Sequence, residues 1–220
     1  VGGAGWDRAA IGAFSCFARA WGVPVAAAFR RQSALMNDHP TWAGNLGYGP
    51  NPRLVERIRA ADLLLVVGPR LGEATTDGYT LVTPDHPGQT LIHVHPDPAE
   101  LHRTYRADLA ICSGMGEFAD ALATAPEPAE LSPAGAEAHA EYLAWSTPAP
   151  REGVALDLGP CVSAMQDTLP ADTIICNGAG NYSGWWHRYW RYGGHGTQLA
   201  PTAGAMGYGL PAAIAASLRH

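Results

Sequence analysis

The chain has 220 residues, 47% of them hydrophobic, and a formal net charge of −6, so it can form one large or two small domains with a real core. Charged residues are spread along the sequence without a basic stripe, which argues against nucleic acid or a membrane surface as a partner. No apolar run approaches ~18 residues, and no charged start leads into a short apolar segment, so neither a membrane span nor a signal peptide is predicted.

The four cysteines are widely separated and show no CxxC spacing; they are Cys16, Cys112, Cys161 and Cys176. Most of their neighbours are apolar or small, so we expect buried free thiols rather than disulfides or a zinc site. Free thiols favour a reducing, cytoplasmic setting.

The first part of the chain alternates predicted strands and helices, the pattern of a parallel sheet with helices on its faces. Residues 1–5 resemble the last residue of a strand and a tight turn, and Asp7 is placed to cap a helix that runs to Trp21. The later elements are a strand at 23–28, a helix face made by Leu54, Val55, Ile58 and Ala61, a fully buried strand at 63–67, and a strand at 91–94. A short strand within 106–112 and a helix at 117–123 complete a predicted central domain of residues 1–124, whose first strand is truncated.

Prolines at 126, 128, 133, 148 and 150 bracket an Ala/Glu-rich piece at 134–145 that can be helical, and we interpret 125–155 as an interdomain linker. A second unit follows, with a helix through Val162 and Leu169, a strand at 173–176, an aromatic-rich helix at 182–192 and a helix from Gly209 onward. A doubly wound domain needs more strands than this. We therefore expect 156–220 to be the N-terminal part of a domain, and the chain to be an internal fragment of a longer protein.

The segment PTAGAMGYGLPAAIAA at 201–216 places small residues around one large apolar side chain at the mouth of a predicted helix. Gly204, Gly207 and Gly209 let the backbone approach a ligand closely, Met206 supplies the one bulky contact, and Pro211 suits the first turn of a helix. Such a helix mouth favours anions. The segment predicts a cofactor cradle; the alternative is a tight turn before a packed helix.

This segment closely resembles the GxMGxGLPAAIGA run of thiamine diphosphate enzymes of the acetolactate synthase family. Three other segments match family motifs in the same order: ADLLLVVGPR at 61–70, LIHVHPDPAE at 91–100, and a strand followed by NGAGNYSGW at 177–185. The resemblance implies an α/β fold: a parallel-sheet central domain of the DHS-like nucleotide-binding type, followed by the truncated start of a thiamin diphosphate-binding α/β domain.

The resemblance also implies roles for residues of the cradle. In the family, the backbone carbonyl at the Gly204 position accepts a hydrogen bond from the 4'-amino group of the cofactor, and the Met206 position wedges beneath the bent cofactor. These two are the candidate catalytic residues, because the bend makes proton removal from C2 intramolecular. Gly180, Asn181 and Tyr182 match positions that touch the diphosphate, although Asn181 and Tyr182 replace the usual Gln and His. The alternative is a turn with Asn181 in a left-handed conformation.

Two glycine-rich turns lie at strand ends of the central domain, where open α/β sheets bind ligands; they contain Gly2, Gly3 and Gly68. Flavin-binding relatives match at these glycines and at Arg70, which contacts the nucleotide there. Their following FDDR is replaced here by LGEA at 71–74, without the second arginine. FAD, an ADP-like nucleotide and an empty vestigial site all remain open.

Two further groups of side chains have alternative interpretations. An aromatic cluster at helical spacing predicts packing against a core or a partner subunit rather than a substrate cage; it consists of Trp185, Trp186, Tyr189, Trp190 and Tyr192. His187 and His195 can titrate near neutrality, but we interpret them as surface or satisfied core residues. His93 and His95 share one face of a predicted strand, and the sequence offers no evident third ligand for zinc.

The full protein thus resembles a thiamine diphosphate-dependent enzyme that decarboxylates or ligates 2-oxo acids, with a homodimer or homotetramer implied. The family's activating Glu and its Mg²⁺-binding GDG segment have no counterpart in the 220 residues, so we expect this chain alone to be inactive. Alternatives are a benzoylformate- or oxalyl-CoA-decarboxylase-like enzyme, and a non-catalytic nucleotide-binding or scaffold module.

Overall fold

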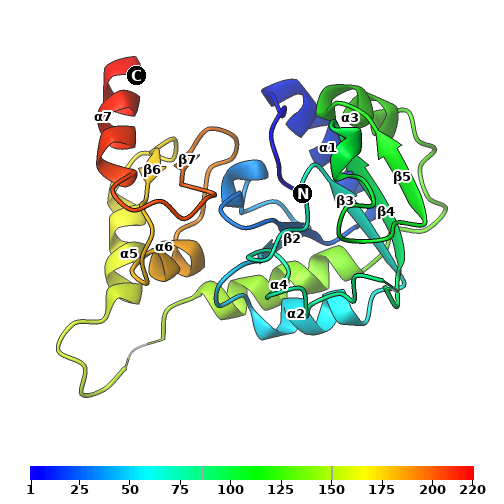
Figure 1. The fold of residues 1–220 in the computed structure, drawn as a ribbon. Coiled ribbons are helices and arrows are strands. Elements are labelled where there is room, and N and C mark those ends of the chain that lie inside the picture. The colour runs from blue at the N-terminus through cyan, green and yellow to red at the C-terminus, as the bar shows by residue number, and fades with distance from the viewer. Residues whose placement is uncertain (86, 150) are drawn as a thin grey trace.

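The computed structural model describes residues 1–85, 87–149 and 151–220, which form two units side by side (Figure 1). The helices of the first unit are α1 (Arg8–Trp21), α2 (Pro52–Arg59), α3 (Met115–Ala123) and α4 (Ala134–Ser146), and its strands are β1 (Val25–Ala27), β2 (Trp42–Asn45), β3 (Leu63–Val67), β4 (Thr90–His95) and β5 (Leu109–Cys112). The second unit contains α5 (Leu158–Thr168), β6 (Ile175–Cys176), α6 (Ser183–Tyr189), β7 (Gln198–Leu199) and α7 (Gly209–Arg219). Short 3-10 turns lie at Gln32–Ala34 and Pro98–Glu100.

Every strand pair in the described residues is parallel, which confirms the predicted α/β class. The strand order is β1-β2 in one sheet, β3-β4-β5 in a second and β6-β7 in a third. Val1 connects the first two sheets: its amino group donates to the Ala26 carbonyl at 2.8 Å, and its own carbonyl accepts from the Ala28 N–H at 2.8 Å. The Gly2 N–H donates to the Val67 carbonyl at 3.1 Å. Val1 therefore lies between β1 and β3, and the two sheets form one continuous layer.

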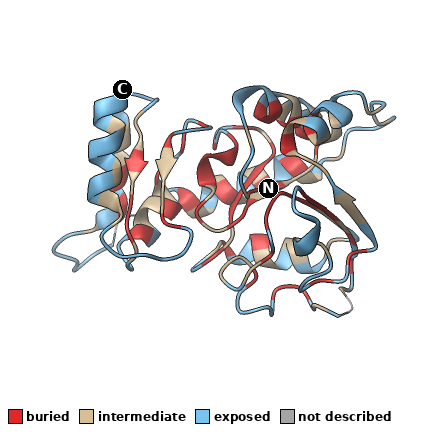
Figure 2. Ribbon diagram, turned by 45° about the horizontal axis from the view of Figure 1, so that its top comes forward, coloured by how far each residue is buried: buried red, intermediate tan, exposed pale blue. Residues whose placement is uncertain are grey.

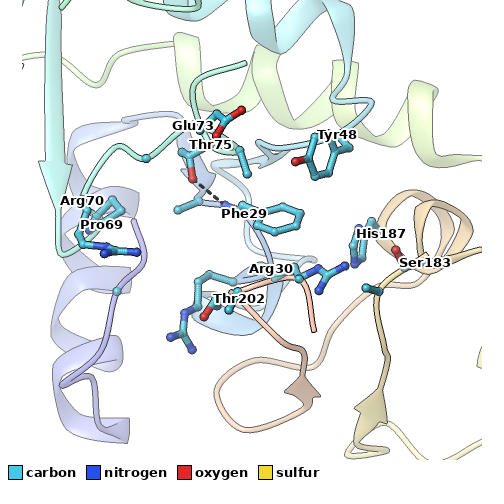
Figure 3. Close-up of a pocket in the computed structure, with 18 of the residues that line it drawn as sticks. Phe29, Arg30, Tyr48, Pro69, Arg70, Glu73, Thr75, Ser183, His187 and Thr202 are labelled. Carbon is cyan, nitrogen blue, oxygen red and sulfur yellow. Dashed lines mark hydrogen bonds between the residues drawn. The ribbon is translucent and has the colours of Figure 1, made fainter. Parts of the chain in front are cut away.

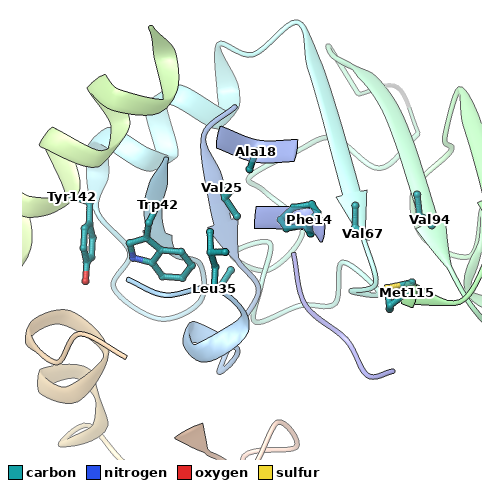
Figure 4. Packing of buried hydrophobic residues seen from close by; sticks show 10 residues of the cluster. Phe14, Ala18, Val25, Leu35, Trp42, Val67, Val94, Met115 and Tyr142 are labelled. Atoms are coloured by element: carbon teal, nitrogen blue, oxygen red, sulfur yellow. The ribbon is translucent and has the colours of Figure 1, made fainter. Parts of the chain in front are cut away.

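The core of the first unit has two parts, because alternate side chains of the strands point to opposite faces of the central layer. Val67 and Val94 face the cluster that contains Phe14 of α1 and Met115 of α3 (Figure 4), whereas Leu91 faces the other side. The side chain of Asp7 caps α1 by accepting from the Ala10 N–H at 2.8 Å, as the sequence predicted. Helices α1 and α3 therefore cover one face of the layer, and α2 packs on the other.

Helix α4 lies within the segment interpreted as a linker, and it packs on the first unit. Nδ1 of His139 on α4 lies 2.9 Å from the carbonyl oxygen of Trp42 on β2. On the same helix, Glu141 accepts two hydrogen bonds from the Arg57 guanidinium of α2 at 3.1 and 2.9 Å. Pro150, one of the bracketing prolines, lies outside the described residues. The division at 124 and 156 stays a prediction.

The second unit has a small aromatic core. Its buried members are Val162, Ile175, Trp190 and Tyr192, and Trp185, Trp186 and Tyr189 pack against them. The aromatic cluster thus packs within a core, one of the two roles predicted for it. Helix α6 ends at Tyr189, so Trp190 and Tyr192 join the core from extended chain rather than from the predicted longer helix.

Two expectations about burial were wrong, and one strand was missed. The strand at 63–67 is not fully buried, because Leu63 is 49% exposed at its start. None of the four cysteines is buried, although all are free: Cys16 and Cys112 are exposed, Cys112 on a strand paired along one side only. Strand β2 was not predicted. Among the described residues, no helix combines the length and apolar character needed to cross a membrane.

Candidate functional site

A cavity of about 950 Å³ lies where the carboxyl ends of the parallel strands of both units converge (Figure 3). The residues of one wall lie just after Val1 and at or just after the ends of β1, β3 and β4, and those of the other wall lie just after β6 and β7. Its lining includes Gly3, Gly68, Arg70, Gly180, Asn181 and Gly204. The structure therefore brings six of the nine predicted binding residues into one site, at the sheet edge where α/β folds bind ligands.

The predicted nucleotide-binding turns face each other across a very close backbone contact. Gly3 has φ +75° and Gly68 has φ +91°, conformations that favour glycine. A Cβ atom at Gly3 would collide with the carbonyl oxygen of Gly68, and one at Gly68 with that of Gly2. Gly2 is buried behind this contact and lines no part of the cavity, whereas Arg70 is exposed at its edge. Gly2 therefore supports the wall, and Gly3, Gly68 and Arg70 can touch a ligand.

On the opposite wall, Gly180 has φ +142°, and Asn181 is not left-handed. The alternative of a left-handed Asn181 was therefore wrong, because Gly180 takes the unusual conformation. Tyr182 turns its hydroxyl back to accept a hydrogen bond from the Gly178 N–H at 2.7 Å, and it does not line the cavity. Gly180 and Asn181 remain the residues of this turn that can meet an anion.

The predicted cradle is an open glycine loop before α7. Gly204 and Gly207 have φ +74° and +76°, and a Cβ at either position would meet no atom within 4 Å. Met206 is 87% exposed and lies outside the cavity lining. Helix α7 has no buried residue and is largely exposed (Figure 2), although its start packs against β6. The cofactor cradle and the alternative of a tight turn before a packed helix both stay predictions. The loop presents free backbone and one free methionine.

Among the cavity residues that were not chosen from the sequence, Arg30 and His187 carry buried polar atoms without a hydrogen-bond partner among the described residues. Arg30 is 5% exposed, its guanidinium lies 4.7 Å from the centre of the Phe29 ring, and it donates to the Pro201 carbonyl. Its Nε has no hydrogen-bond partner among residues 1–85, 87–149 and 151–220. Burial lowers the pKa of Arg30 from its ordinary value. The sequence held one signal, because Phe29, Arg30 and Arg31 directly follow a predicted strand.

His187 of α6 is the second such residue. It is 8% exposed, and its Nε2 is buried without a partner among the described residues, so the interpretation of His187 as a surface or satisfied core residue was wrong. Burial, and secondly the charge of Arg30, lower the pKa of His187 to about 4. The imidazole is therefore neutral at pH 7. His195, in contrast, is exposed.

The remaining histidine pair makes local contacts. His93 Nε2 lies 2.9 Å from the Pro69 carbonyl oxygen, and His95 Nδ1 accepts from the Asp97 N–H at 3.0 Å. Burial lowers the pKa of His93. Within the described parts of the chain, no group of three or more His, Cys, Asp or Glu residues is arranged to hold a metal ion.

Comparison with known proteins gives one family and a set of relatives. Residues 1–122 match the family model described as thiamine pyrophosphate enzyme, central domain. The chain is 24% identical to the acetolactate synthase isozyme 2 large subunit of Escherichia coli (strain K12), covering 99% of this chain and 39% of that protein. It is 24% identical to the acetolactate synthase large subunit of Parasynechococcus marenigrum, covering 99% of this chain and 35% of that protein. For a sulfoacetaldehyde acetyltransferase of Roseovarius nubinhibens the identity is 28%, with 89% of this chain and 36% of that protein covered.

Proposed function

The chain belongs to the thiamine pyrophosphate enzyme family, and from this membership we propose that it is part of a thiamine diphosphate-dependent enzyme that decarboxylates or ligates 2-oxo acids. Because the chain spans between 35% and 39% of the three relatives described above, the activity of the whole protein is inferred. Those relatives bear acetolactate synthase and acetyltransferase names, which favours an acetolactate synthase-like activity over a benzoylformate- or oxalyl-CoA-decarboxylase-like one.

The observation that carries this proposal is the open glycine loop at the mouth of α7. Its left-handed glycines have free space around them, so a flat cofactor ring can approach the backbone. A Cβ at Gly209 would lie 3.0 Å from the Gly178 nitrogen, which shows how closely the start of α7 approaches the end of β6. These features fit thiamine diphosphate.

We assign roles to the chain's own residues on this basis. The Gly204 carbonyl would accept a hydrogen bond from the aminopyrimidine, and the Met206 side chain would support the cofactor in the wedge role that the resemblance implies. Backbone N–H groups near Gly180 and Asn181, with the N-terminus of α7, would hold the diphosphate. When bound, thiamine diphosphate supplies the electron sink for cleavage or formation of the bond beside the 2-oxo carbon.

The finer points of the assignment are proposals that follow from the resemblance. We propose Mg²⁺ as the diphosphate counter-ion, held by ligands outside these 220 residues, and a homodimer or homotetramer as the assembly. We also propose a cytoplasmic location, which the wide spacing of the four cysteines supports.

A nucleotide in the same cavity is the second candidate, and the paired turns at Gly3 and Gly68 favour it. The cavity volume of about 950 Å³ lies in the range that organic cofactors occupy, and Arg70 stands at the edge of the cavity. We propose FAD or ADP as the ligand. Arg70→Ala in the full-length protein should weaken binding of either nucleotide roughly tenfold, whereas the exposed Arg53→Ala should not. Purification of the protein without a nucleotide, together with no binding on titration, would remove this candidate.

The experiment for the main proposal is calorimetric titration of thiamine diphosphate with Mg²⁺ into the full-length protein, with the 220-residue chain measured beside it. Binding to the full-length protein alone supports a site completed by residues outside the chain. Absence of binding to both would contradict the proposal and favour a non-catalytic nucleotide-binding module.

A further inference from the structure

Arg30 is a buried cation without a carboxylate partner. Its side chain belongs to a residue that is only 5% exposed, and none of the ion pairs among the described residues includes it. Removing a charge from water costs several kcal/mol unless an opposite charge or full hydrogen bonding compensates. Within the described parts of the chain, the guanidinium donates one hydrogen bond, to the Pro201 carbonyl, and its Nε has no partner. A ligand anion would compensate this cation.

His187 adds a second unpartnered polar atom to the same cavity wall. Arg30 points toward His187 in Figure 3, and both residues line the cavity. The Nε2 atom of His187 is buried without a partner. A neutral imidazole carries one N–H, so His187 can donate a hydrogen bond beside the guanidinium without adding repulsion.

The side chains that line the cavity carry an excess of positive charge, which also favours an anion. Three arginines line it, Arg30, Arg31 and Arg70, against one acidic residue, Glu73. The whole chain carries a formal charge of −6, so this local excess of positive charge is specific to the cavity. Confined in a cleft, such charges raise the local concentration of anions.

We propose that Arg30 and His187 form an anion subsite that binds a carboxylate or phosphate group of the cavity's ligand, beside the Gly204 loop. Pro201, which Arg30 holds, lies three residues before Gly204, so the subsite adjoins the cradle. The anion subsite itself does not depend on the proposed function. Only its position next to a bound thiamine diphosphate rests on that proposal. Guanidinium recognises both anions through the same charge-assisted hydrogen bonds.

The test compares a charged ligand with a neutral one of nearly the same shape in the full-length protein. Binding of pyruvate and of pyruvamide is measured for the wild type, Arg30→Met and Arg53→Met; Arg53 is an exposed arginine paired with Glu56 at 3.0 Å. We expect the wild-type preference for pyruvate to fall about tenfold or more in Arg30→Met and to stay unchanged in Arg53→Met. Because a folding defect would weaken both ligands alike, the ratio reports on the charge contact.

A parallel titration with ADP separates the two sources of the anion. Loss of the pyruvate preference identifies a carboxylate subsite, and loss of ADP affinity with an unchanged pyruvate preference identifies a phosphate subsite. His187→Phe should lower the affinity for the same anion severalfold. Unchanged pyruvate preference and unchanged ADP affinity in Arg30→Met would overturn the inference.

Thiamine diphosphate binding, measured for the same variants, keeps the two proposals distinct. A protein that binds thiamine diphosphate but shows no Arg30-dependent anion binding contradicts the subsite alone. Arg30-dependent anion binding in a protein that does not bind thiamine diphosphate contradicts the proposed function and leaves the subsite standing.

Discussion

Met206 is the most exposed large apolar side chain of the described residues, at 87%, on a loop bordered by left-handed glycines. Exposure of this degree stabilises nothing in the fold, so its substitution should act through the ligand. We predict that Met206→Ala in the full-length protein lowers turnover about 10- to 100-fold, because a poorly bent cofactor misplaces the reacting atoms. Calorimetry should show a much smaller loss of thiamine diphosphate affinity.

The matched control for this prediction is Met165→Ala on α5, where the methionine is 39% exposed and does not line the cavity. It should leave turnover near the wild-type value. Unchanged turnover in Met206→Ala would remove the wedge role, whereas an equal loss in both variants would indicate a general packing effect.

His187 should make stability depend on pH in the acidic range. Its pKa is lowered from 6.5 to about 4 in the folded protein, so the unfolded chain takes up the proton first as the pH falls. The contribution of His187 to the free energy of unfolding is therefore complete above pH 6.5. It falls as the pH is lowered toward 4, by roughly 3 kcal/mol over this range. Urea unfolding at pH 7 and pH 5 should therefore show a smaller pH effect for His187→Phe than for the wild type. If the same substitution at exposed His195 reduces the pH effect as much, the assignment to His187 is wrong.

At the scale of elements, the turns after Val1 and β3 depend on one another through Gly3 and Gly68. We predict that Gly3→Ala costs roughly 1–3 kcal/mol, because the residue has φ +75° and the new Cβ would strike the Gly68 backbone. Gly12→Ala is the control: this glycine lies within α1, and a Cβ there meets no atom within 4 Å. It should gain about 0.5–1 kcal/mol through helix propensity. Chemical denaturation measures both, and a neutral Gly3→Ala would contradict the close contact.

Elements with a clear hydrophobic pattern or a helix cap could be predicted from the sequence, and short buried strands could not. Asp7 marks the start of α1, and the run of aliphatic residues at 63–67 coincides with β3. Strand β2 contains Gly44 and Asn45 and is buried at all four positions, so it has neither alternation nor an aliphatic run. Strand β7 has two residues and exists through its pairing with β6. In both, tertiary contacts override local propensity.

The candidate site was predictable in its glycines and in Arg70, but not in its buried arginine. Positive φ values at Gly3, Gly68, Gly180 and Gly204 agree with sequence arguments based on turns. The importance of Arg30 depends on burial against Pro201, a residue 171 positions away in the chain, and no local pattern encodes that contact. The orientation of Tyr182 away from the cavity likewise depends on its bond to Gly178.

At the scale of the whole molecule, the segment after β1 connects the two units and thereby shapes the cavity. The Gln198 side chain donates to that of Gln32 at 2.6 Å, and Arg30 holds the loop before α7. Asn37 forms the most complete link: its N–H donates to the Tyr192 carbonyl, and its Oδ1 accepts from the Tyr192 N–H, both at 3.0 Å. Hydrogen bonds from this segment therefore link the two cavity walls, and those of the Arg30 and Asn37 side chains are buried.

Asn37→Ala should for this reason loosen the second unit selectively. The residue is 2% exposed, and its loss leaves the Tyr192 N–H buried without a partner, at a cost of about 1–3 kcal/mol. Hydrogen exchange of the full-length protein should show faster exchange at the amides of Ile175 and Asn177, which bond across β6 and β7, with little change at Val94.

Asn51→Ala is the matched control, because Asn51 is also buried, at 3% exposure. Its side-chain amide makes its hydrogen bonds within the first unit: it accepts from the Arg53 N–H and donates to the Glu141 carbonyl. It should lower stability by roughly 0.5–2 kcal/mol through the lost helix cap, without accelerating exchange at β6. If both variants accelerate exchange uniformly, the units unfold as one body, and Asn37 is an ordinary buried residue. If only Asn37→Ala affects β6, the affinities for nucleotide and for thiamine diphosphate should fall together in that variant, because both proposed sites draw residues from the two cavity walls.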